Sequence, residues 1–423
     1  MTNRGNKYGA VIKNNLGFLS GFFHLGSIQA SNAIIQLLLF PLIIHITGLE
    51  EFGIVIVANT YGSLNAMFIN YGTNQSGIKD VALHKDDPRK LASIFYTTYY
   101  ARIILFVLSL LLLAVLYQFD FPHVRYFPFA LTIIFAEVLN PFFFFAGTEK
   151  VSLYNLANLI SKSASALLIY FLVTSPDLGI WVNFYLGITN VAVYGILGVY
   201  LIRKYRLTNY RVSKSSLTAF FKKNFFLVGN NLSTSLQQAI FVFALSFSGD
   251  KIILGAYSFC DKIVWSFRML IIAFTTAIFP RAANMYKESA EKWQRFRNRI
   301  NQFMAICFIL AAASILVFAP MVVEIFTKTH NELAITFTRA ICFVPLIAAL
   351  NAMNVVDLLL KNKYHYIFII AMILLAISAI VSFIFIKLNN RSIFGFYQVI
   401  VEIFSLPLYL YFIRKSEREK DAA

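Results

Sequence analysis

The sequence predicts an all-α integral membrane protein of twelve transmembrane helices in two six-helix lobes around a central cavity, with both termini in the cytoplasm. Three observations lead to this fold class: the composition, the length of the apolar runs and the distribution of basic residues. Of the 423 residues, 59% are hydrophobic and only 13% are charged. So few polar groups cannot cover a soluble particle of this size.

The apolar runs indicate helices. They are about 20 residues or longer, which is the length that an α-helix needs to cross a bilayer. Strands of an outer-membrane barrel would be about 10 residues long with strict alternation, and the sequence shows no such alternation. We expect no removable signal peptide, because no short apolar region ends in a small-residue cleavage site. The twelve spans are placed at residues 22–46, 53–76, 92–117, 126–147, 151–173, 178–202, 224–248, 252–280, 301–323, 333–359, 364–386 and 393–413.

The basic residues predict the orientation of these spans. With the N-terminus in the cytoplasm, 27 of the 37 basic residues fall on the inner side, 5 fall on the outer side and the rest lie inside spans. Such asymmetry over short loops is typical of a membrane protein with both ends inside. The net charge of +17 is therefore explained by topology, and we expect no binding of nucleic acid.

A basic loop at residues 203–223 divides the chain into an N-terminal lobe, residues 1–202, and a C-terminal lobe, residues 224–423. Six spans on each side enter the membrane in the same orientation, which permits a parallel repeat. When the chain is shifted by 202 residues, Gly53 aligns with Gly255 and Met67 with Met269. The chain is therefore expected to be an internal duplication.

The two leading helices of the lobes have matching polar faces. Residues at i, i+3 and i+7 share one face of a helix, and polar residues occupy these positions in both spans 1 and 7. They are Gln29, Asn32 and Gln36 in the first copy and Asn231, Thr234 and Gln238 in the second. Span 2 has a further polar face, formed by Asn59, Ser63 and Asn70.

Several charged residues lie deep inside spans. An ionised side chain at the bilayer centre costs about 3 kcal/mol or more, so these residues should face the protein interior or a water-filled cavity. The deep set is Arg102, Glu137, Lys162, Asp261, Lys262, Arg268 and Glu402. Two interpretations remain open for each residue: a salt bridge between helices, as in a pairing of Arg102 with Glu137 or of Lys162 with Glu402, or a functional charge.

Span 8 favours the functional interpretation. Asp261, Trp265 and Arg268 fall at i, i+4 and i+7 on one face, and Lys262 points about a quarter-turn away. By the repeat, span 8 matches span 2, so spans 1, 2, 7 and 8 are predicted to line a central cavity. A surplus of cations there would suit a phosphate or pyrophosphate group, and the neutral polar residues would suit the hydroxyls of a sugar.

Other kinds of site are not indicated. The six histidines are scattered without metal-ligand spacing, and Cys260, Cys307 and Cys342 all fall inside spans, where they act as small apolar packing residues. The sequence has no phosphate-binding glycine loop, no paired-aspartate motif in an inner loop and no large outer loop. We therefore predict no catalytic residues, no metal site and no cofactor.

Four stretches resemble the Wzx-type polysaccharide flippases, which transport O-antigen and exopolysaccharide units and are related to the multidrug and toxic-compound extrusion (MATE) exporters. They are FPLIIHITGLEEFG at residues 40–53, YGTNQSGIKDVA at 71–82, PFFFFAGTEKVSLYNLANLISK at 141–162 and LGAYSFCDKI at 254–263. In the third stretch, Phe-Phe-Ala-Gly stands where the family usually has Trp-Phe-Gln-Gly. The resemblance extends over all twelve spans.

The resemblance implies a MATE-like, two-lobed, alternating-access transporter in the bacterial cytoplasmic membrane. Its substrate would be an undecaprenyl-pyrophosphate-linked oligosaccharide, moved from the inner to the outer leaflet for lipopolysaccharide or other surface polysaccharide. We then expect Arg102, Lys162, Lys262 and Arg268 to contact the anion. Asp261, Glu137 and Glu402 are candidates for coupling to a proton or sodium gradient, or to the membrane potential. Other polysaccharide-assembly membrane proteins are possible partners.

Three alternatives remain open from the sequence. A MATE-type ion-coupled exporter of small molecules would favour a cavity with fewer cations and more acidic residues. A lipid II flippase would commonly have spans beyond twelve. A membrane-embedded glycan-processing enzyme would need an outer-face carboxylate or histidine pair.

Overall fold

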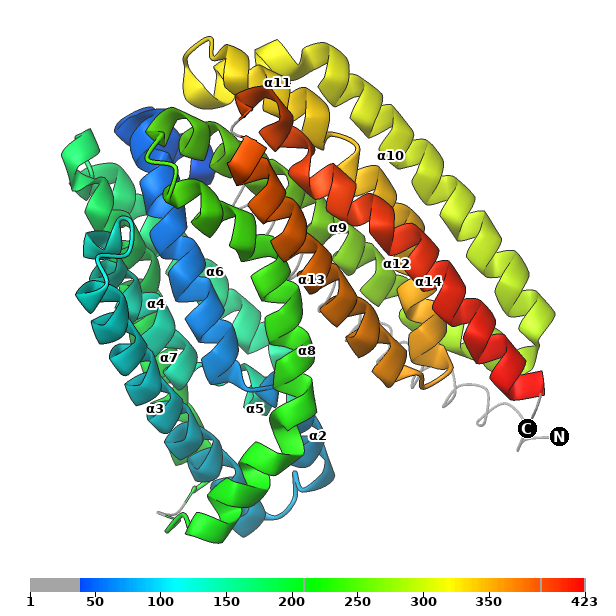
Figure 1. Ribbon diagram of the computed structural model, residues 1–423. Helices are drawn as coiled ribbons and strands as arrows, with labels where there is room; N and C mark the ends of the chain where they lie inside the picture. The colour runs from blue at the N-terminus through cyan, green and yellow to red at the C-terminus, as the bar shows by residue number, and fades with distance from the viewer. Residues whose placement is uncertain (1–38, 208–209, 389, 422–423) are drawn as a thin grey trace, which may run out of the picture.

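The computed structural model describes residues 39–207, 210–388 and 390–421, and all regular structure in these ranges is helical (Figure 1). Residues 39–70 are helical. The elements that follow are α2 (Thr73–Leu83), α3 (Pro88–Gln118), η1 (Val124–Tyr126), α4 (Phe127–Leu139), α5 (Phe142–Gly147), α6 (Val151–Leu172), η2 (Pro176–Trp181), α7 (Val182–Lys204), α8 (Lys214–Ser246), α9 (Lys251–Glu288), α10 (Ala290–Thr327), α11 (Glu332–Ile341), α12 (Val344–Leu360), α13 (Tyr364–Leu388), η3 (Arg391–Phe396) and α14 (Tyr397–Asp421).

The chain is a multi-pass membrane protein. Among the described residues, nine helices are long and apolar enough to cross a bilayer, and α9, which bends by 48° between Thr276 and Arg281, makes a tenth. These ten lie at the predicted spans 2 to 6 and 8 to 12. The helix α8 lies at the predicted seventh span but is not among the ten. Most of the predicted first span, 22–46, lies outside the described residues.

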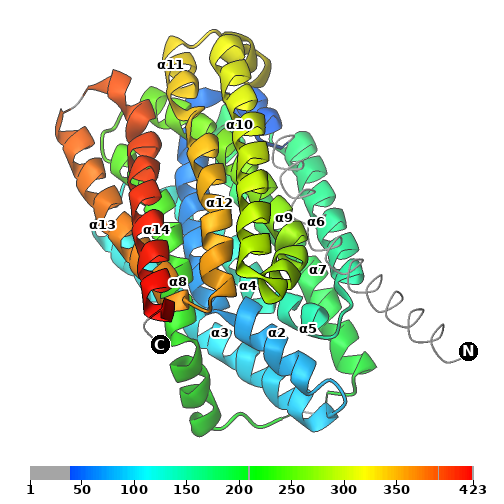
Figure 2. The same cartoon turned by 90° about the vertical axis from the view of Figure 1, so that its right-hand side faces the viewer.

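The helices form two groups that lie side by side in Figure 1, and Figure 2 shows the molecule from the side of the second group. The first group contains residues 39–70 and α2 to α7, with α7 packed against α4 and α6. The second contains α8 to α14, with α12 packed against α9, α10 and α14. We call them the N-lobe and the C-lobe.

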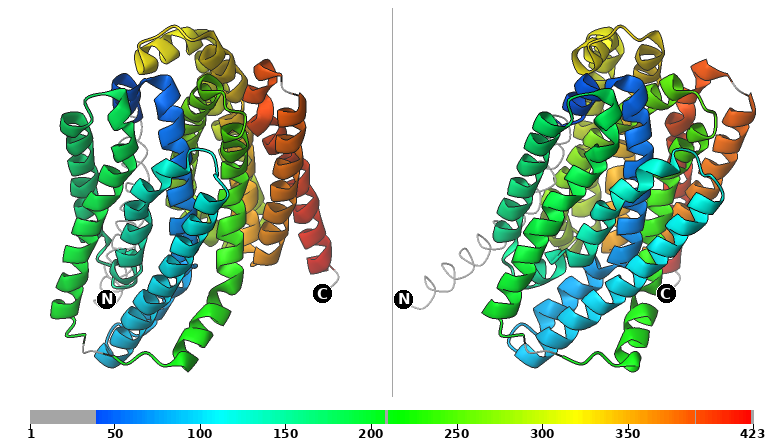
Figure 3. Two further views of the ribbon diagram at one scale, coloured as in Figure 1. Left: turned by 60° about the vertical axis from the view of Figure 1, so that its left-hand side comes forward. Right: turned by 90° about the vertical axis from the view of Figure 1, so that its left-hand side faces the viewer.

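The helix α8 lies at the boundary of the two lobes. It packs extensively on α13 of the C-lobe and also contacts α3 and α2 of the N-lobe, so that it stands between α3 and α13 in Figure 3. Its first turns, residues 214–223, are the second half of the segment predicted as a linker. On these turns Lys223 forms an ion pair with Asp80 of α2 at 2.5 Å.

The helical chain reverses direction at Gly48, between the predicted spans 1 and 2. Gly48 has φ of +77°, a left-handed conformation that glycine adopts without steric cost. The rings of Phe40 and Phe52 lie 6.1 Å apart, whereas twelve residues of a straight helix would separate them by about 18 Å. Residues 39–70 therefore form the end of one helix and a second, antiparallel helix, as the sequence predicts.

The lobes meet closely at the end predicted to face outward. A Cβ atom on Gly53 would lie 2.7 Å from the backbone nitrogen of Gly255, and one on Gly255 would lie 2.1 Å from the carbonyl oxygen of Leu49. Nearby, the rings of Phe121 and Phe247 lie 5.0 Å apart. Only glycine permits backbones to approach so closely, so the two lobes are in direct backbone contact at this end.

Candidate functional site

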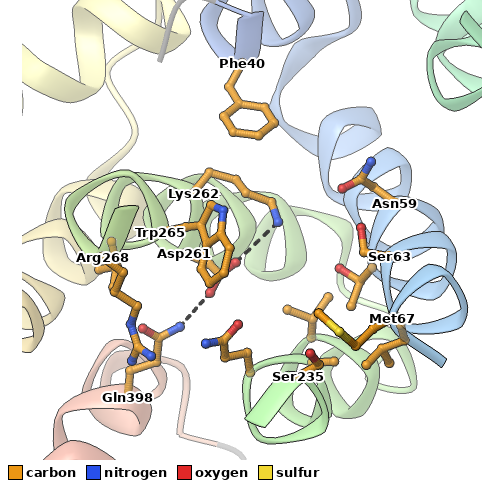
Figure 4. Close-up of a pocket in the computed structure, with 16 residues that line it drawn as sticks. Phe40, Asn59, Ser63, Met67, Ser235, Asp261, Lys262, Trp265, Arg268 and Gln398 are labelled. Atoms are coloured by element: carbon orange, nitrogen blue, oxygen red, sulfur yellow. Dashed lines mark hydrogen bonds and ion pairs between the residues drawn. The ribbon is translucent and has the colours of Figure 1, made fainter. Parts of the chain in front are cut away.

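A cavity of about 260 Å³ lies between the lobes. Its walls come from the helix that follows Gly48, from α8 and α9, and from the start of α14 (Figure 4). The residues that line it are Phe40, Asn59, Thr60, Ser63, Leu64, Met67, Ser235, Gln238, Ala239, Val242, Asp261, Lys262, Val264, Trp265, Arg268 and Gln398. We call this space the inter-lobe cavity.

The predicted polar face of α9 lies on this cavity. Asp261, Trp265 and Arg268, spaced at i, i+4 and i+7, all line it together with Lys262. The opposite wall is neutral, with Asn59 and Ser63 projecting from the N-lobe (Figure 4). The two leading hairpins of the predicted repeat therefore contribute unlike chemistry to one space.

The charges in the cavity are paired. Lys262 Nζ lies 3.6 Å from Asp261 Oδ2, and the Asp261 Oδ1 atom accepts a hydrogen bond of 2.6 Å from Gln398 Nε2 (Figure 4). Arg268 forms an ion pair with Glu402 of α14. Each of the two cations therefore has a carboxylate partner, but Glu402 does not line this cavity, so its described walls carry two cations and one carboxylate.

A second space of about 530 Å³ continues from the inter-lobe cavity into the C-lobe. The two share Gln238, Trp265 and Arg268, and we call the second space the C-lobe chamber. Its other lining residues are Asn230, Thr234, Gln237, Ile271, Ile272, Thr275, Thr276, Phe279, Ala348, Asn351, Ala352, Val355, Val356, Leu359, Ile367, Ala371, Leu374, Glu402, Ser405 and Tyr409. The Arg268–Glu402 pair therefore stands where the two spaces join.

Arg102 lies away from both spaces, inside the N-lobe. Its side chain is completely buried and donates hydrogen bonds to the carbonyl oxygens of Glu137 (2.9 Å) and Asn140 (2.6 Å) and to Thr73 Oγ1 (2.6 Å). Its Nη2 atom lies 3.8 Å from Glu137 Oε1. This geometry favours the salt-bridge interpretation of Arg102 and Glu137 that the sequence left open.

Asn70 belongs to the same N-lobe network. Its Nδ2 atom donates a hydrogen bond of 2.6 Å to Glu137 Oε1, so it faces α4, whereas Asn59 and Ser63 face the inter-lobe cavity. Asn140 Nδ2 donates to the second Glu137 oxygen at 2.8 Å. Glu137 thus accepts bonds from two amides beside the arginine.

Of the other residues predicted for the site, some line one or both of these spaces and others line neither. Thr234 lines the chamber and Gln238 lines both spaces, whereas Lys162 and Asn231 line neither. The suggested partner of Lys162, Glu402, is paired with Arg268 instead. Three predicted lining residues, Gln29, Asn32 and Gln36, lie outside the described residues.

One lining residue that sequence reasoning missed is Gln398. It holds the Asp261 carboxylate and lies four residues before Glu402 on the same helix, so the two share one face of α14. The sequence signal that could have identified Gln398 is the presence of a glutamine and a glutamate at i and i+4 in an otherwise apolar span. Phe40, Thr60, Met67 and Ser235 also line the cavity, but nothing in their spacing distinguishes them from packing residues.

Comparisons with known proteins agree with this architecture. A solved inward-facing multidrug resistance MATE family transporter of the MOP superfamily matches 91% of this chain and 96% of its own, with a TM-score of 0.73 and 13% identity. An outward-facing structure with the same description matches 95% and 97%, with a TM-score of 0.59 and 14% identity. These likenesses show a MATE-like fold.

Sequence comparisons identify the family. A protein of Escherichia coli (strain K12) named "Putative O-antigen transporter" is 25% identical over 282 residues, which span 64% of this chain and 66% of the relative's own length. The model of the family described as "Polysaccharide biosynthesis protein" matches residues 18–286, more than half of the chain. The resemblance seen in the sequence is thereby confirmed: the chain belongs to the polysaccharide biosynthesis protein family, the family of the Wzx-type flippases.

Proposed function

We propose that this protein is a polysaccharide flippase that moves a polyprenyl-pyrophosphate-linked oligosaccharide from the inner to the outer leaflet of the bacterial cytoplasmic membrane. The glycan would serve surface polysaccharide biosynthesis of the O-antigen kind. The named relative is a transporter and the structural neighbours are transporters, so the protein is not an enzyme. The choice of the cytoplasmic membrane, the direction of movement between leaflets and the lipid carrier are parts of the proposal.

The observation that supports the proposal best is the inter-lobe cavity itself. It has basic and acidic groups on the C-lobe wall and neutral hydrogen-bonding groups on the N-lobe wall. Arginine and lysine donors match phosphate oxygens, and asparagine and serine match sugar hydroxyls. One cavity therefore offers both kinds of contact that a sugar joined to a phosphate requires.

An anionic substrate would bind by taking the place of the carboxylates that now pair with the two cations. Arg268 is held by Glu402 and Lys262 by Asp261, so a pyrophosphate would replace the carboxylates as the partner of each cation. Protonation or cation binding would compensate the displaced carboxylates, which makes Asp261 and Glu402 the candidates for coupling to a proton or sodium gradient. Glu137 is a less favoured candidate, because it lines neither the inter-lobe cavity nor the C-lobe chamber.

Alternating access is part of the proposal, and the way the lobes meet supports it. The glycine contact seals the predicted outer end, so the cavity would load from the inner side in this conformation. Separation of the lobes at the outer end would then release the headgroup into the outer leaflet. Both termini would lie in the cytoplasm, as the basic loops predict.

The proposal is tested with full-length protein in proteoliposomes, by measuring the movement of a fluorescent undecaprenyl-pyrophosphate-linked oligosaccharide between leaflets. We expect Arg268→Gln to reduce the rate at least tenfold, because the anion loses its bidentate donor, and Arg268→Lys to restore part of it. Arg203→Gln, at an exposed arginine outside both spaces, is the matched control. Wild-type rates in folded Arg268→Gln would contradict the assignment.

The second candidate is a MATE-type exporter of small organic cations. The paired charges favour it, because Asp261 lines the inter-lobe cavity and Glu402 lines the adjoining C-lobe chamber, where acidic groups would suit a cation. Uptake of ethidium into the same proteoliposomes under an imposed proton or sodium gradient separates the two. A flippase should transport the lipid-linked glycan and leave ethidium outside.

A further inference from the structure

The C-lobe chamber has a chemical character different from that of the inter-lobe cavity, and we propose that it is a subsite for the first isoprene units of the lipid carrier. This inference rests on the proposed function, since it assigns a place to the lipid part of the same substrate. The chamber's volume of about 530 Å³ is within the range of small-molecule sites, about 300–1,000 Å³. It therefore has room for a segment of a chain beyond a headgroup.

The chamber presents apolar surface. Its far walls come from α9, α12 and α13, where Ile271, Ala348, Val355 and Leu374 are among the lining residues. Branched hydrocarbon fits such a surface, because close packing of methyl groups gains dispersion contacts and removes apolar area from water.

Most of the polar groups in the walls are already satisfied by the protein. The hydroxyls of Thr234, Thr275 and Thr276 each donate to a backbone carbonyl four residues earlier, at 3.1, 2.9 and 2.7 Å. These residues therefore present methyl groups to the chamber. Asn351 Nδ2 donates to Ser405 Oγ at 2.5 Å, and Ser405 in turn bonds Glu402. The described amide side chains without such a bond, Asn230, Gln237 and Gln238, lie on α8, so a sugar would find few free partners on the walls formed by α12 and α13.

The cation at the junction sets the orientation of the substrate. Arg268 lines both spaces and so does Trp265. A phosphate bound to Arg268 would place its sugar in the polar inter-lobe cavity and its lipid end in the chamber. The two compartments thus match the two halves of an amphiphile whose charge lies between them.

The occupant is a single prenyl chain rather than the acyl chains of a phospholipid. A polyprenyl phosphate has one chain, attached directly to the phosphate, whereas a phospholipid has two chains that diverge from a glycerol. The described residues form the C-lobe chamber on one side of Arg268 and the inter-lobe cavity on the other, so a second acyl chain that entered the cavity would lie against its polar walls. An acyl chain buried against polar walls would not gain the favourable free energy of apolar contact.

The chamber is tested by filling it. Ala352→Phe and Ala371→Phe each project a ring into the empty space, and Ala313→Phe, at an exposed position of α10 outside both spaces, is the matched control. Binding to full-length protein in nanodiscs is measured with two probes, undecaprenyl pyrophosphate and methyl pyrophosphate. We expect both chamber variants to bind the first probe at least tenfold more weakly and the second as wild type does.

The outcomes separate this inference from the proposed function. If wild-type protein binds neither probe, the flippase proposal fails. If it binds both and the folded chamber variants bind undecaprenyl pyrophosphate normally, the chamber assignment fails alone. Crosslinking of a photoreactive undecaprenyl phosphate to wild-type protein tests whether the prenyl chain occupies the chamber without any variant. The crosslinks should map to α12 and α13 around Ala352 and Ala371. Equal displacement of this probe by phosphatidic acid would overturn the preference for a prenyl chain.

Discussion

Two arginines that look alike in the sequence have different surroundings in the structure. Arg102 and Arg268 both interrupt apolar spans, and each forms an ion pair with a glutamate. Arg102 is completely buried among backbone carbonyls, whereas Arg268 lines both spaces of the site. A guanidinium whose donors are bound to the protein holds helices together, and one that lines a cavity is available to a ligand.

Removing the Arg102 side chain should therefore affect folding. We expect Arg102→Met to lower the free energy of unfolding by about 3 to 5 kcal/mol, because Glu137 would be left as an uncompensated buried charge. Thermal unfolding in detergent measures the change, with Arg89→Met at an exposed position as the control. If Arg102→Met is as stable as wild type but has lost glycan transport, Arg102 contacts the substrate instead of stabilising the fold.

At the scale of helices, the predicted repeat explains why the lobes meet at glycines. Gly53 and Gly255 are 202 positions apart, which makes them equivalent in the predicted repeat. In a parallel repeat, equivalent residues contact one another only at the axis that relates the copies. Their close approach therefore places that axis between the two hairpins, next to the inter-lobe cavity.

This contact is sensitive to one methyl group. A Cβ on Gly255 would lie 2.1 Å from the Leu49 carbonyl oxygen, so Gly255→Ala should force the helices apart at the predicted outer end. Reaction of an engineered cysteine at Phe121 with a membrane-impermeant maleimide measures the opening, and the rate should rise severalfold. Gly195→Ala, where a Cβ would meet nothing within 4 Å, should leave the rate unchanged. Equal rates in both variants would show that the contact does not hold the end closed.

At the scale of the whole molecule, the conformation is closed at the predicted outer end. An alternating-access cycle would require the seal formed by Gly53, Gly255 and the Phe121–Phe247 contact to open once in each cycle.

A crosslink across this seal should stop transport. With Cys260, Cys307 and Cys342 replaced by serine, we introduce Phe121→Cys and Phe247→Cys, whose wild-type rings lie 5.0 Å apart. A short cleavable bifunctional maleimide should abolish glycan movement in proteoliposomes, and cleavage of the reagent should restore it. Each single-cysteine protein treated in the same way serves as control. Undiminished transport by fully crosslinked protein would exclude a cycle that opens this end.

Much of the architecture could be predicted from the sequence because it depends on local composition. Apolar runs of sufficient length must be helices in a bilayer, since no other structure satisfies the backbone there. The turn at Gly48 and the shared face of Asp261, Trp265 and Arg268 also follow from neighbouring residues and helical periodicity. The family could be identified from short motifs for the same reason.

The pairing of charges was decided only by tertiary structure. Helical periodicity tells which face of a span is polar, but it does not tell which distant helix that face meets. Glu402 could satisfy Lys162 or Arg268, and packing of α14 against the rest of the C-lobe brought it to Arg268. Likewise Asn70 faces Glu137, whereas Asn59 and Ser63 on the same helix face the cavity. The sequence by itself thus determined the helices and their polar faces, and the packing of helices within each lobe determined which charges are paired inside the protein and which line the two spaces.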